Sequence, residues 1–157
     1  VKNIGESISK KFIGKKPIFI GVLKGSFIFT ADLLRSIKID CEVEFIKVQS
    51  YKGTQSTGNV KIISDIKTNL KGRHIIVVED IIDSGKTIKF LISEFKKKSV
   101  KSISIATFLM KSNQQKFDFS IDYIGFEIKQ GFVVGYGLDF NQKYRNLDSV
   151  YVLESKN

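Results

Sequence analysis

The chain has 157 residues, of which 42% are hydrophobic and 27% charged, the composition of one soluble globular domain with a sizeable core. No apolar run approaches the roughly 18 residues of a membrane span, and a single cysteine, Cys41, excludes an internal disulfide. The formal net charge is +10, but only three of the 26 basic residues are arginine, which favours a solvated lysine-rich surface over a nucleic-acid reader.

Apolar runs alternate with helical patterns along the chain. The pattern at residues 74–78 is continuous and β-branched, which is typical of a central parallel strand. In chain order we predict a strand at 17–23, a helix at 26–37, strands at 41–48 and 74–78, a helix at 87–97, and strands at 102–109, 123–127 and 132–136. No repeat or linker interrupts them, so we expect one domain over residues 1–157. Because the first residue is Val1 and not Met, we also expect a few N-terminal residues to be missing.

This order of elements predicts an α/β fold with a mainly parallel, twisted sheet flanked by helices. Ligands of such sheets bind beyond the carboxyl ends of the strands. We expect two of these ends at Leu23 and Val78, so the chemistry should lie in Lys24-Gly25 and in residues 79–87. The polar, glycine-bearing segment 50–59 is long for a connection and fits either a lid or an ordinary hairpin.

The segment after Val78 combines acids with a phosphate-friendly helix start. Adjacent carboxylates, here Glu79 and Asp80, can hold sugar hydroxyls or a hydrated Mg²⁺. Backbone N–H groups at the start of the next helix, together with the hydroxyls of Ser84 and Thr87, can bind a phosphate. A ligand with both a phosphate and a diol would satisfy both halves.

Two simpler interpretations of this segment were weighed. Gly85-Lys86-Thr87 invites comparison with a nucleotide-binding P-loop, but the earlier glycine of that motif would fall at Asp80, where an acid repels phosphate. Asp83 could be no more than the N-cap of the following helix, a role that aspartate often fills. That alternative stays open at this point.

Five separated segments, in the same order, resemble those of type I phosphoribosyltransferases of the hypoxanthine-guanine branch. They are the pyrophosphate loop at residues 21–26, the catalytic lid at 50–58, the phosphoribosyl-pyrophosphate (PRPP) signature at 77–87, the base-binding region at 123–139 and the C-terminal signature at 144–147. The likeness runs from Ile4 over nearly the whole chain. It implies that family's fold, with a small hood and a flexible lid.

The resemblance also implies a reaction and its partners. The expected reaction joins hypoxanthine or guanine to the phosphoribosyl group of PRPP, giving IMP or GMP and pyrophosphate. It implies Mg²⁺ as cofactor, a cytoplasmic homodimer or homotetramer, and no nucleic-acid or membrane partner. The bond formed is N-glycosidic, so the transition state should resemble an oxocarbenium ion.

The resemblance assigns roles to the PRPP signature. Asp83 is the expected general base, taking or shielding the proton on purine N7. Glu79 and Asp80 are expected to bind the ribose hydroxyls and Mg²⁺. The 5′-phosphate cradle would consist of Ser84, Gly85, Lys86 and Thr87.

Outside that signature, the resemblance assigns the pyrophosphate and the lid. Lys24 and Gly25 would approach the pyrophosphate with backbone groups, and the peptide bond before this lysine can be cis in relatives. Arg145 would add positive charge there. Ser50 and Tyr51 would close over the reaction centre and exclude water.

The purine site is expected from four residues. Phe132 would stack on the base, although a buried core aromatic is an equal alternative. Lys111 would donate to the 6-oxo group and so select hypoxanthine and guanine over adenine. Backbone groups of Val133 would contact the other edge. Asp139 would contact the purine or a second Mg²⁺, unless it only forms a turn.

Two segments depart from the family pattern. Lys129-Gln130-Gly131 lacks the proline and lysine that relatives often carry before the stacking aromatic, and residues 112–115 lack the proline and arginine expected after Lys111. Two other classes of protein were considered. One is a regulatory PRPP-binding protein that binds RNA or DNA, and the other is a phosphoacceptor module with an acidic Mg²⁺ pocket. The second leaves the 84–87 segment and the C-terminal half unexplained.

Overall fold

The computed structural model of the chain describes residues 1–50, 60–111, 117–129 and 131–153, except for the side chain of Ser50. The expected lid residue Tyr51, the rest of the lid, and Gln130 lie outside these residues. The elements are α1 (Lys2–Lys11), β1 (Ile18–Leu23), α2 (Phe27–Ser36), β2 (Glu42–Ser50), β3 (Val60–Ser64), β4 (His74–Ile82), α3 (Lys86–Lys97), β5 (Ser102–Lys111), β6 (Tyr123–Ile128), β7 (Phe132–Val134) and β8 (Tyr151–Leu153). No helix among them is long and apolar enough to cross a membrane.

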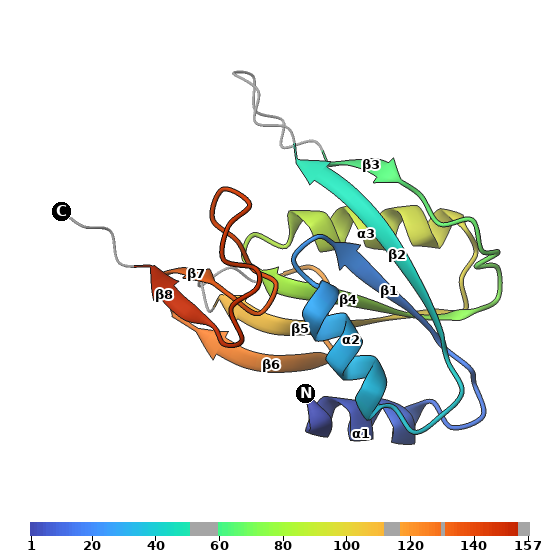
Figure 1. The fold of residues 1–157 in the computed structure, drawn as a ribbon. Coiled ribbons are helices and arrows are strands. Elements are labelled where there is room, and N and C mark those ends of the chain that lie inside the picture. The colour runs from blue at the N-terminus through green and yellow to red at the C-terminus, as the bar shows by residue number, and fades with distance from the viewer. Residues whose placement is uncertain (51–59, 112–116, 130, 154–157) are drawn as a thin grey trace.

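A six-stranded sheet in the order β3-β2-β1-β4-β5-β6 forms the centre of the molecule (Figure 1). All neighbours are parallel except β2 and β3, which are antiparallel. The predicted α/β fold with a mainly parallel sheet is therefore confirmed. After β1 the chain moves to one side of the sheet, and from β4 onward it moves to the other. The strand order thus reverses between β1 and β4, the place where such sheets bind ligands.

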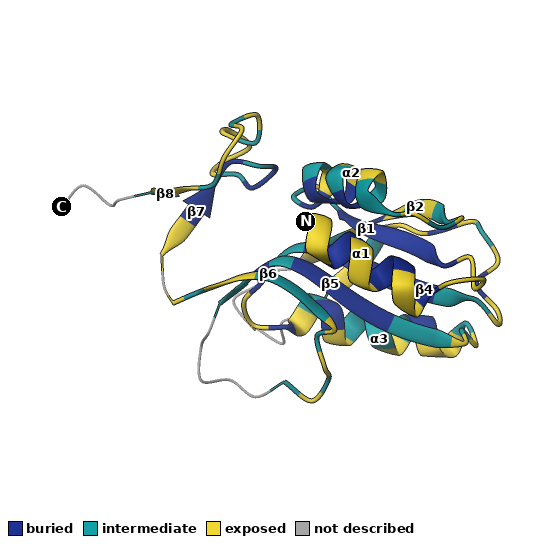
Figure 2. Cartoon of the chain, turned by 90° about the horizontal axis from the view of Figure 1, so that it is seen from below, coloured by how far each residue is buried: buried dark blue, intermediate teal, exposed yellow. Residues whose placement is uncertain are grey.

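Helices cover both faces of the sheet, with α1 and α2 on one face and α3 on the other (Figures 1 and 2). Because side chains alternate along a strand, each central strand contributes to both layers of the core. Ile75 and Val77 of β4 pack in the layer under α3, whereas Ile76 and Val78 pack in the layer under α1 and α2. These strands are fixed on both faces, so the loops at their carboxyl ends start from rigid positions.

The strands and helices that were predicted occur within a few residues of their expected bounds, but the end of β4 was placed wrongly. Val78 was expected to end this strand, whereas β4 continues to Ile82. The reason is continued pairing with β5, where Glu79 lies opposite Thr107 and Ile82 opposite Met110. The acidic pair therefore belongs to the strand and not to the turn after it.

Three elements were not predicted. The first is the helix α1: Ile4, Ile8 and its C-cap Phe12 are spaced by four and all buried, a pattern that would have identified it. The edge strand β3 is largely exposed and lacks a clear alternation. The third, β8, is only three residues long and is exposed at two of them.

A small second sheet follows the main one. β7 and β8 pair antiparallel and, with the segment between them, form what we call the hood, residues 132–153. Val133 and Leu138 of the hood pack on Leu109 of β5 in a separate apolar cluster. This places the hood over the carboxyl end of β5, as the small hood implied by the resemblance would require.

Candidate active site

The carboxyl ends of β1 and β4 meet at the point where the strand order reverses. Their pairing ends at Gly21 opposite Val78, so the last residues of β4 pair with β5 alone. A cis peptide bond joins Leu23 to Lys24, in agreement with the expectation from the family. A Cβ atom on Gly25 would lie 1.5 Å from Oδ2 of Asp80. The loop after β1 therefore lies directly against the acidic end of β4, and only glycine permits that approach.

Glu79 and Asp80 form an acidic pair in which Glu79 is buried and Asp80 half-buried. The side chain of Glu79 is buried, and its Oε1 accepts a hydrogen bond from the backbone N–H of Asp80 at 3.3 Å. Asp80 Oδ1 accepts from the N–H of Ile81 at 2.8 Å. Burial, with the nearby charge of Asp80, raises the pKa of Glu79 well above its usual range. Burial also raises the pKa of Asp80, while hydrogen bonds and the charge of Arg145 oppose that rise.

The chemistry of this pair fits a magnesium ion. Two neighbouring carboxylates in a poorly solvated place resist ionising together, and a divalent cation would stabilise their charged forms. The residues that the structure describes contain no cluster of three or more potential protein ligands. Three protein ligands are not required for Mg²⁺, because this ion is usually held by one or two carboxylates, with waters and substrate oxygens as the other ligands.

The loop between β4 and α3 lies at a helix N-terminus, where backbone N–H groups can bind an anion. Gly85 is the N-cap of α3 and adopts a left-handed conformation, with φ 68° and no side-chain hydrogen bond capping the helix. The N-cap role considered for Asp83 is therefore wrong. A cavity of about 130 Å³ lies at this helix start and is lined by Glu79, Ile81, Ile82, Asp83, Ser84, Gly85, Lys86, Thr87 and Ile88. The structure thus gathers the whole expected phosphate cradle around one small cavity at a helix N-terminus.

Asp83 and Lys111 lie together beside this cavity. β4 ends at Ile82 and β5 at Lys111, and the two strands are parallel with Ile82 opposite Met110. This register brings Lys111 Nζ to 3.0 Å from Asp83 Oδ2. The Asp83 side chain is 52% exposed and that of Lys111 is 21% exposed. An acid that can exchange a proton and a cation that can donate a hydrogen bond are therefore held as a pair.

The expected pyrophosphate cations converge from two distant parts of the chain. Lys24 Nζ and Arg145 Nη2 both donate to Oε1 of Gln142, at 3.3 and 3.2 Å. Arg145 also pairs with Asp139 Oδ1 at 2.8 Å. Asp139 accepts a second hydrogen bond, from the N–H of Gln142 at 2.8 Å. Gln142 was not predicted, and no sequence pattern marks it.

The hood presents Phe132 and buries Val133. Phe132 is 50% exposed, which excludes the alternative of a buried core aromatic. Its ring and that of Phe140 form a T-shaped pair, with centroids 5.5 Å apart and planes at 83°. The Val133 side chain is buried with Leu109 and Leu138, so a base could be contacted there only by backbone groups. Ser50 ends β2, but its side chain and Tyr51 lie outside the described part of the chain.

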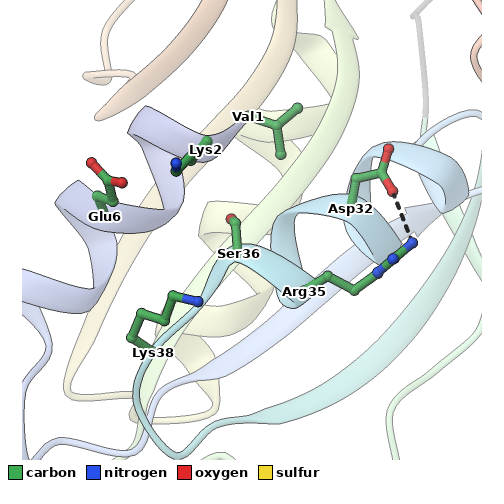
Figure 3. A pocket seen from close by; sticks show the side chains of 7 residues that line it. All are labelled: Val1, Lys2, Glu6, Asp32, Arg35, Ser36 and Lys38. Carbon is green, nitrogen blue, oxygen red and sulfur yellow. Dashed lines mark ion pairs between the residues drawn. The ribbon is translucent and has the colours of Figure 1, made fainter.

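A larger cavity, of about 510 Å³, lies elsewhere (Figure 3). Residues of α1, of α2 and of the turn after α2 line it, and none of them comes from the strand ends: Val1, Lys2, Glu6, Asp32, Arg35, Ser36 and Lys38. Its size does not make it the candidate active site, because it brings together none of the expected substrate-binding residues.

The comparison with protein families agrees with this geometry. The model of the phosphoribosyl transferase domain matches residues 1–141. The chain belongs to this family. The matched part includes both strand ends, the loop between β4 and α3, and the part of the hood that carries Phe132 and Asp139. The resemblance stated from the sequence is therefore confirmed at the level of the family.

Individual relatives are similar over almost the full length. The hypoxanthine-guanine phosphoribosyltransferase of Bacillus subtilis is 44% identical over 155 residues, which are 98% of this chain and 86% of that protein. The crystal structure of a hypoxanthine-guanine phosphoribosyltransferase from Bacillus anthracis has a TM-score of 0.92 at 44% identity, covering 98% of this chain and 91% of that one. A hypoxanthine phosphoribosyltransferase from Staphylococcus aureus gives a TM-score of 0.91 at 37% identity, covering 98% and 86%. The fold is that of a type I phosphoribosyltransferase.

Proposed function

We propose that this chain is a purine-salvage enzyme that transfers the phosphoribosyl group of PRPP to hypoxanthine or guanine. The products are IMP or GMP and pyrophosphate. Relatives that carry this activity in their names are more than 40% identical over nearly all of the chain. We also propose that residues 1–157 work as a single phosphoribosyltransferase domain.

The observation that carries the proposal is the position of the Asp83–Lys111 pair. It lies at the ends of neighbouring strands, next to the anion cavity at the start of α3. A ribose phosphate in that cavity would place its reactive carbon near both residues. A 6-oxopurine offers groups for both, since its ring N–H can donate to the Asp83 carboxylate and its oxo group can accept from Lys111.

The reaction then divides among named residues. Purine N9 forms the new bond to the anomeric carbon as the bond from that carbon to the pyrophosphate oxygen breaks, and pyrophosphate leaves with the electron pair. Asp83 takes the proton on N7 of the purine, so that no net positive charge remains on the base, or shields that proton while the new bond forms. Lys111 favours bases with a 6-oxo group, because the 6-amino group of adenine presents hydrogens to the ammonium.

The rest of the site would hold the two ends of PRPP. Glu79 and Asp80 would bind the ribose hydroxyls and Mg²⁺, which reduces the negative charge of the departing pyrophosphate. Lys24, Gly25 and Arg145 would bind the pyrophosphate itself. Ser50 and Tyr51 would close over the centre, and Asp139 would orient Arg145 through their ion pair.

The proposal is tested by a panel of bases. The protein is mixed with Mg²⁺, PRPP and one of hypoxanthine, guanine, xanthine or adenine, and nucleotide formation is followed by absorbance. Turnover is expected with hypoxanthine or guanine, absent with adenine, and lost when EDTA removes divalent cations. Absence of turnover with every base would contradict the proposal and favour the nucleic-acid-binding alternative. That alternative predicts RNA or DNA binding that weakens steeply with salt.

A second prediction concerns the base-stacking ring. Replacing Phe132 by alanine is expected to raise KM for the purine roughly tenfold, because aromatic stacking on a base contributes about 1–3 kcal/mol. KM for PRPP should change little. The control is Ile13→Ala, which removes an exposed apolar side chain (69% exposed) outside all the segments of the expected site. Equal effects of the two variants on purine KM would contradict a stacking role for Phe132.

We further propose a cytoplasmic protein that associates as a homodimer or homotetramer. A lone free cysteine, Cys41, suits a reducing compartment.

Self-association is supported by large apolar side chains that are exposed on neighbouring strands, Val43 and Phe45 of β2 and Ile63 of β3. Sedimentation equilibrium measures the assembly directly, and a monomer at micromolar concentration would contradict this part of the proposal.

A further inference from the structure

Tyr136 forms a long-range contact that the reaction described above does not use. Its hydroxyl donates to Asp32 Oδ2 at 2.6 Å, although the two residues are 104 positions apart. Tyr136 belongs to the hood, and Asp32 lies on α2. The ring of Tyr136 packs on Phe108 of β5, with centroids 4.7 Å apart. The side chain is thus held at both its ring and its hydroxyl.

The backbone around Tyr136 is unusual. Gly135, Tyr136 and Gly137 all have positive φ, at 93°, 51° and 98°. A left-handed conformation is unfavourable for a residue with a bulky side chain. The two side-chain contacts of Tyr136 offset this cost and keep the hood in one position.

The contact joins the two elements that supply the expected pyrophosphate groups. α2 begins immediately after the Lys24-Gly25 loop, and the N–H of Phe27 donates to the carbonyl of Lys24 at 3.3 Å. On the hood side, Gly137 and Arg145 are doubly linked: the N–H of Gly137 donates to the Arg145 carbonyl at 3.0 Å, and Arg145 Nη1 donates to the Gly137 carbonyl at 2.8 Å. The Asp32–Tyr136 bond therefore connects the helix that follows Lys24 to the segment of the hood that is bonded to Arg145.

These elements are in close contact at the site itself. A Cβ atom on Gly137 would lie 2.2 Å from the carbonyl oxygen of Gly25, whose own α-carbon lies against Asp80. There is therefore no space for an added atom where the hood contacts the loop after β1, or where that loop contacts the acidic end of β4. A small shift of the hood would move Arg145 relative to Lys24 and open these contacts.

We propose that Tyr136 is a positioning residue which, through Asp32, sets the spacing between the Lys24-Gly25 loop and Arg145 and so determines how well pyrophosphate groups are bound. The inference rests on the proposed function, because that function makes PRPP the ligand of this surface. It predicts a larger effect on PRPP than on the purine, since Asp83 and Lys111 lie at the ends of β4 and β5, and Val133, the neighbour of Phe132, is packed on Leu109 of β5.

The test uses Tyr136→Phe, which keeps the ring on Phe108 and removes only the hydroxyl. A hydrogen bond to a charged group is strong enough for its loss to raise KM for PRPP roughly tenfold, with KM for hypoxanthine within about twofold of the wild-type value. The matched control is Tyr151→Phe, which removes an exposed hydroxyl that donates to Asp148 at 3.3 Å. It should leave both KM values unchanged.

Changes at Asp32 distinguish positioning from general stability. Asp32→Asn keeps an oxygen acceptor but loses its charge, so its PRPP effect should be smaller than that of Tyr136→Phe, whereas Asp32→Leu should reproduce the full effect. The double variant Tyr136→Phe/Asp32→Leu should be no worse than either single one, because both remove the same bond. Equal rises in the KM of PRPP and hypoxanthine, or a lower Tm with unchanged KM values, would overturn the inference.

Direct binding separates this inference from the proposed function. Inorganic pyrophosphate with Mg²⁺ is titrated calorimetrically into the wild type and into Tyr136→Phe. Weaker binding by the variant supports the positioning role even where no purine is turned over. If the wild type and the variant are equally active and bind pyrophosphate equally well, the positioning role is rejected. The proposed function is then still supported.

Discussion

Replacing Asp83 by asparagine is expected to lower kcat with hypoxanthine or guanine by roughly 10²–10⁴-fold, the range lost when a general base is removed. Asparagine has nearly the same shape and still offers an oxygen to Lys111. It cannot take a proton from the purine. Because Asp83 is not one of the residues 84–87 that are expected to hold the 5′-phosphate, the affinity for PRPP and for the nucleotide product should stay largely as in the wild type. Single-turnover kinetics and nucleotide titration measure the two effects separately.

The matched control for this prediction is Asp65→Asn. Asp65 also pairs with a lysine, Lys98, at 2.8 Å, and its side chain is 49% exposed. It follows β3 and lies beside the C-terminal end of α3, not at the cavity where that helix starts, so normal turnover is expected. Full activity of Asp83→Asn would contradict the role as a base. An Asp83→Asn protein that has lost its fold or its nucleotide binding would show instead that this carboxylate is structural.

Most of the candidate site could be predicted because its residues lie in short segments at the ends of predicted strands. The order of strands and helices implied a parallel sheet, and that sheet brings the groups at its strand ends to one edge. Glu79, Asp80 and residues 83–87 follow one buried strand, and Lys111 ends the next. Their convergence could be expected from the sequence because neighbouring parallel strands end at the same edge. The 3.0 Å contact between Asp83 and Lys111 could not, because it depends on the register of β4 and β5.

Contacts between segments that are far apart in the sequence could not be predicted from sequence patterns. Gln142 receives hydrogen bonds from both Lys24 and Arg145, yet nothing in its neighbourhood suggests a role. The Tyr136–Asp32 bond depends on how the hood docks against α2. Polarity was also misleading at the end of β4, since two acids suggested a turn where strand pairing continues and buries Glu79. In each of these cases the contact depends on tertiary packing, which leaves no local pattern in the sequence.

Replacing Gly25 by alanine is expected to lower kcat/KM for PRPP roughly 100-fold, the loss typical of a misplacement of about 1 Å in an active site. The added methyl group would fall 1.5 Å from Asp80 Oδ2, far inside van der Waals contact. Either the Asp80 carboxylate must rotate away from its place or the loop carrying Lys24 must move. Both changes disturb the binding of PRPP. Steady-state kinetics with PRPP varied at saturating hypoxanthine measure the effect.

Two further variants identify the cause of that loss. Gly14 has a left-handed φ of 70° but open space around its α-carbon, so Gly14→Ala strains the backbone without a clash. It should lower stability by about 1 kcal/mol and leave kcat/KM unchanged.

The Asp80→Ala variant is itself expected to be impaired, but it removes the atom with which the new methyl group collides. If that collision is the cause, Gly25→Ala should cost far less in the Asp80→Ala background than in the wild type. A full 100-fold cost in both backgrounds would mean that Gly25 is required by the pyrophosphate itself and not by the carboxylate behind it.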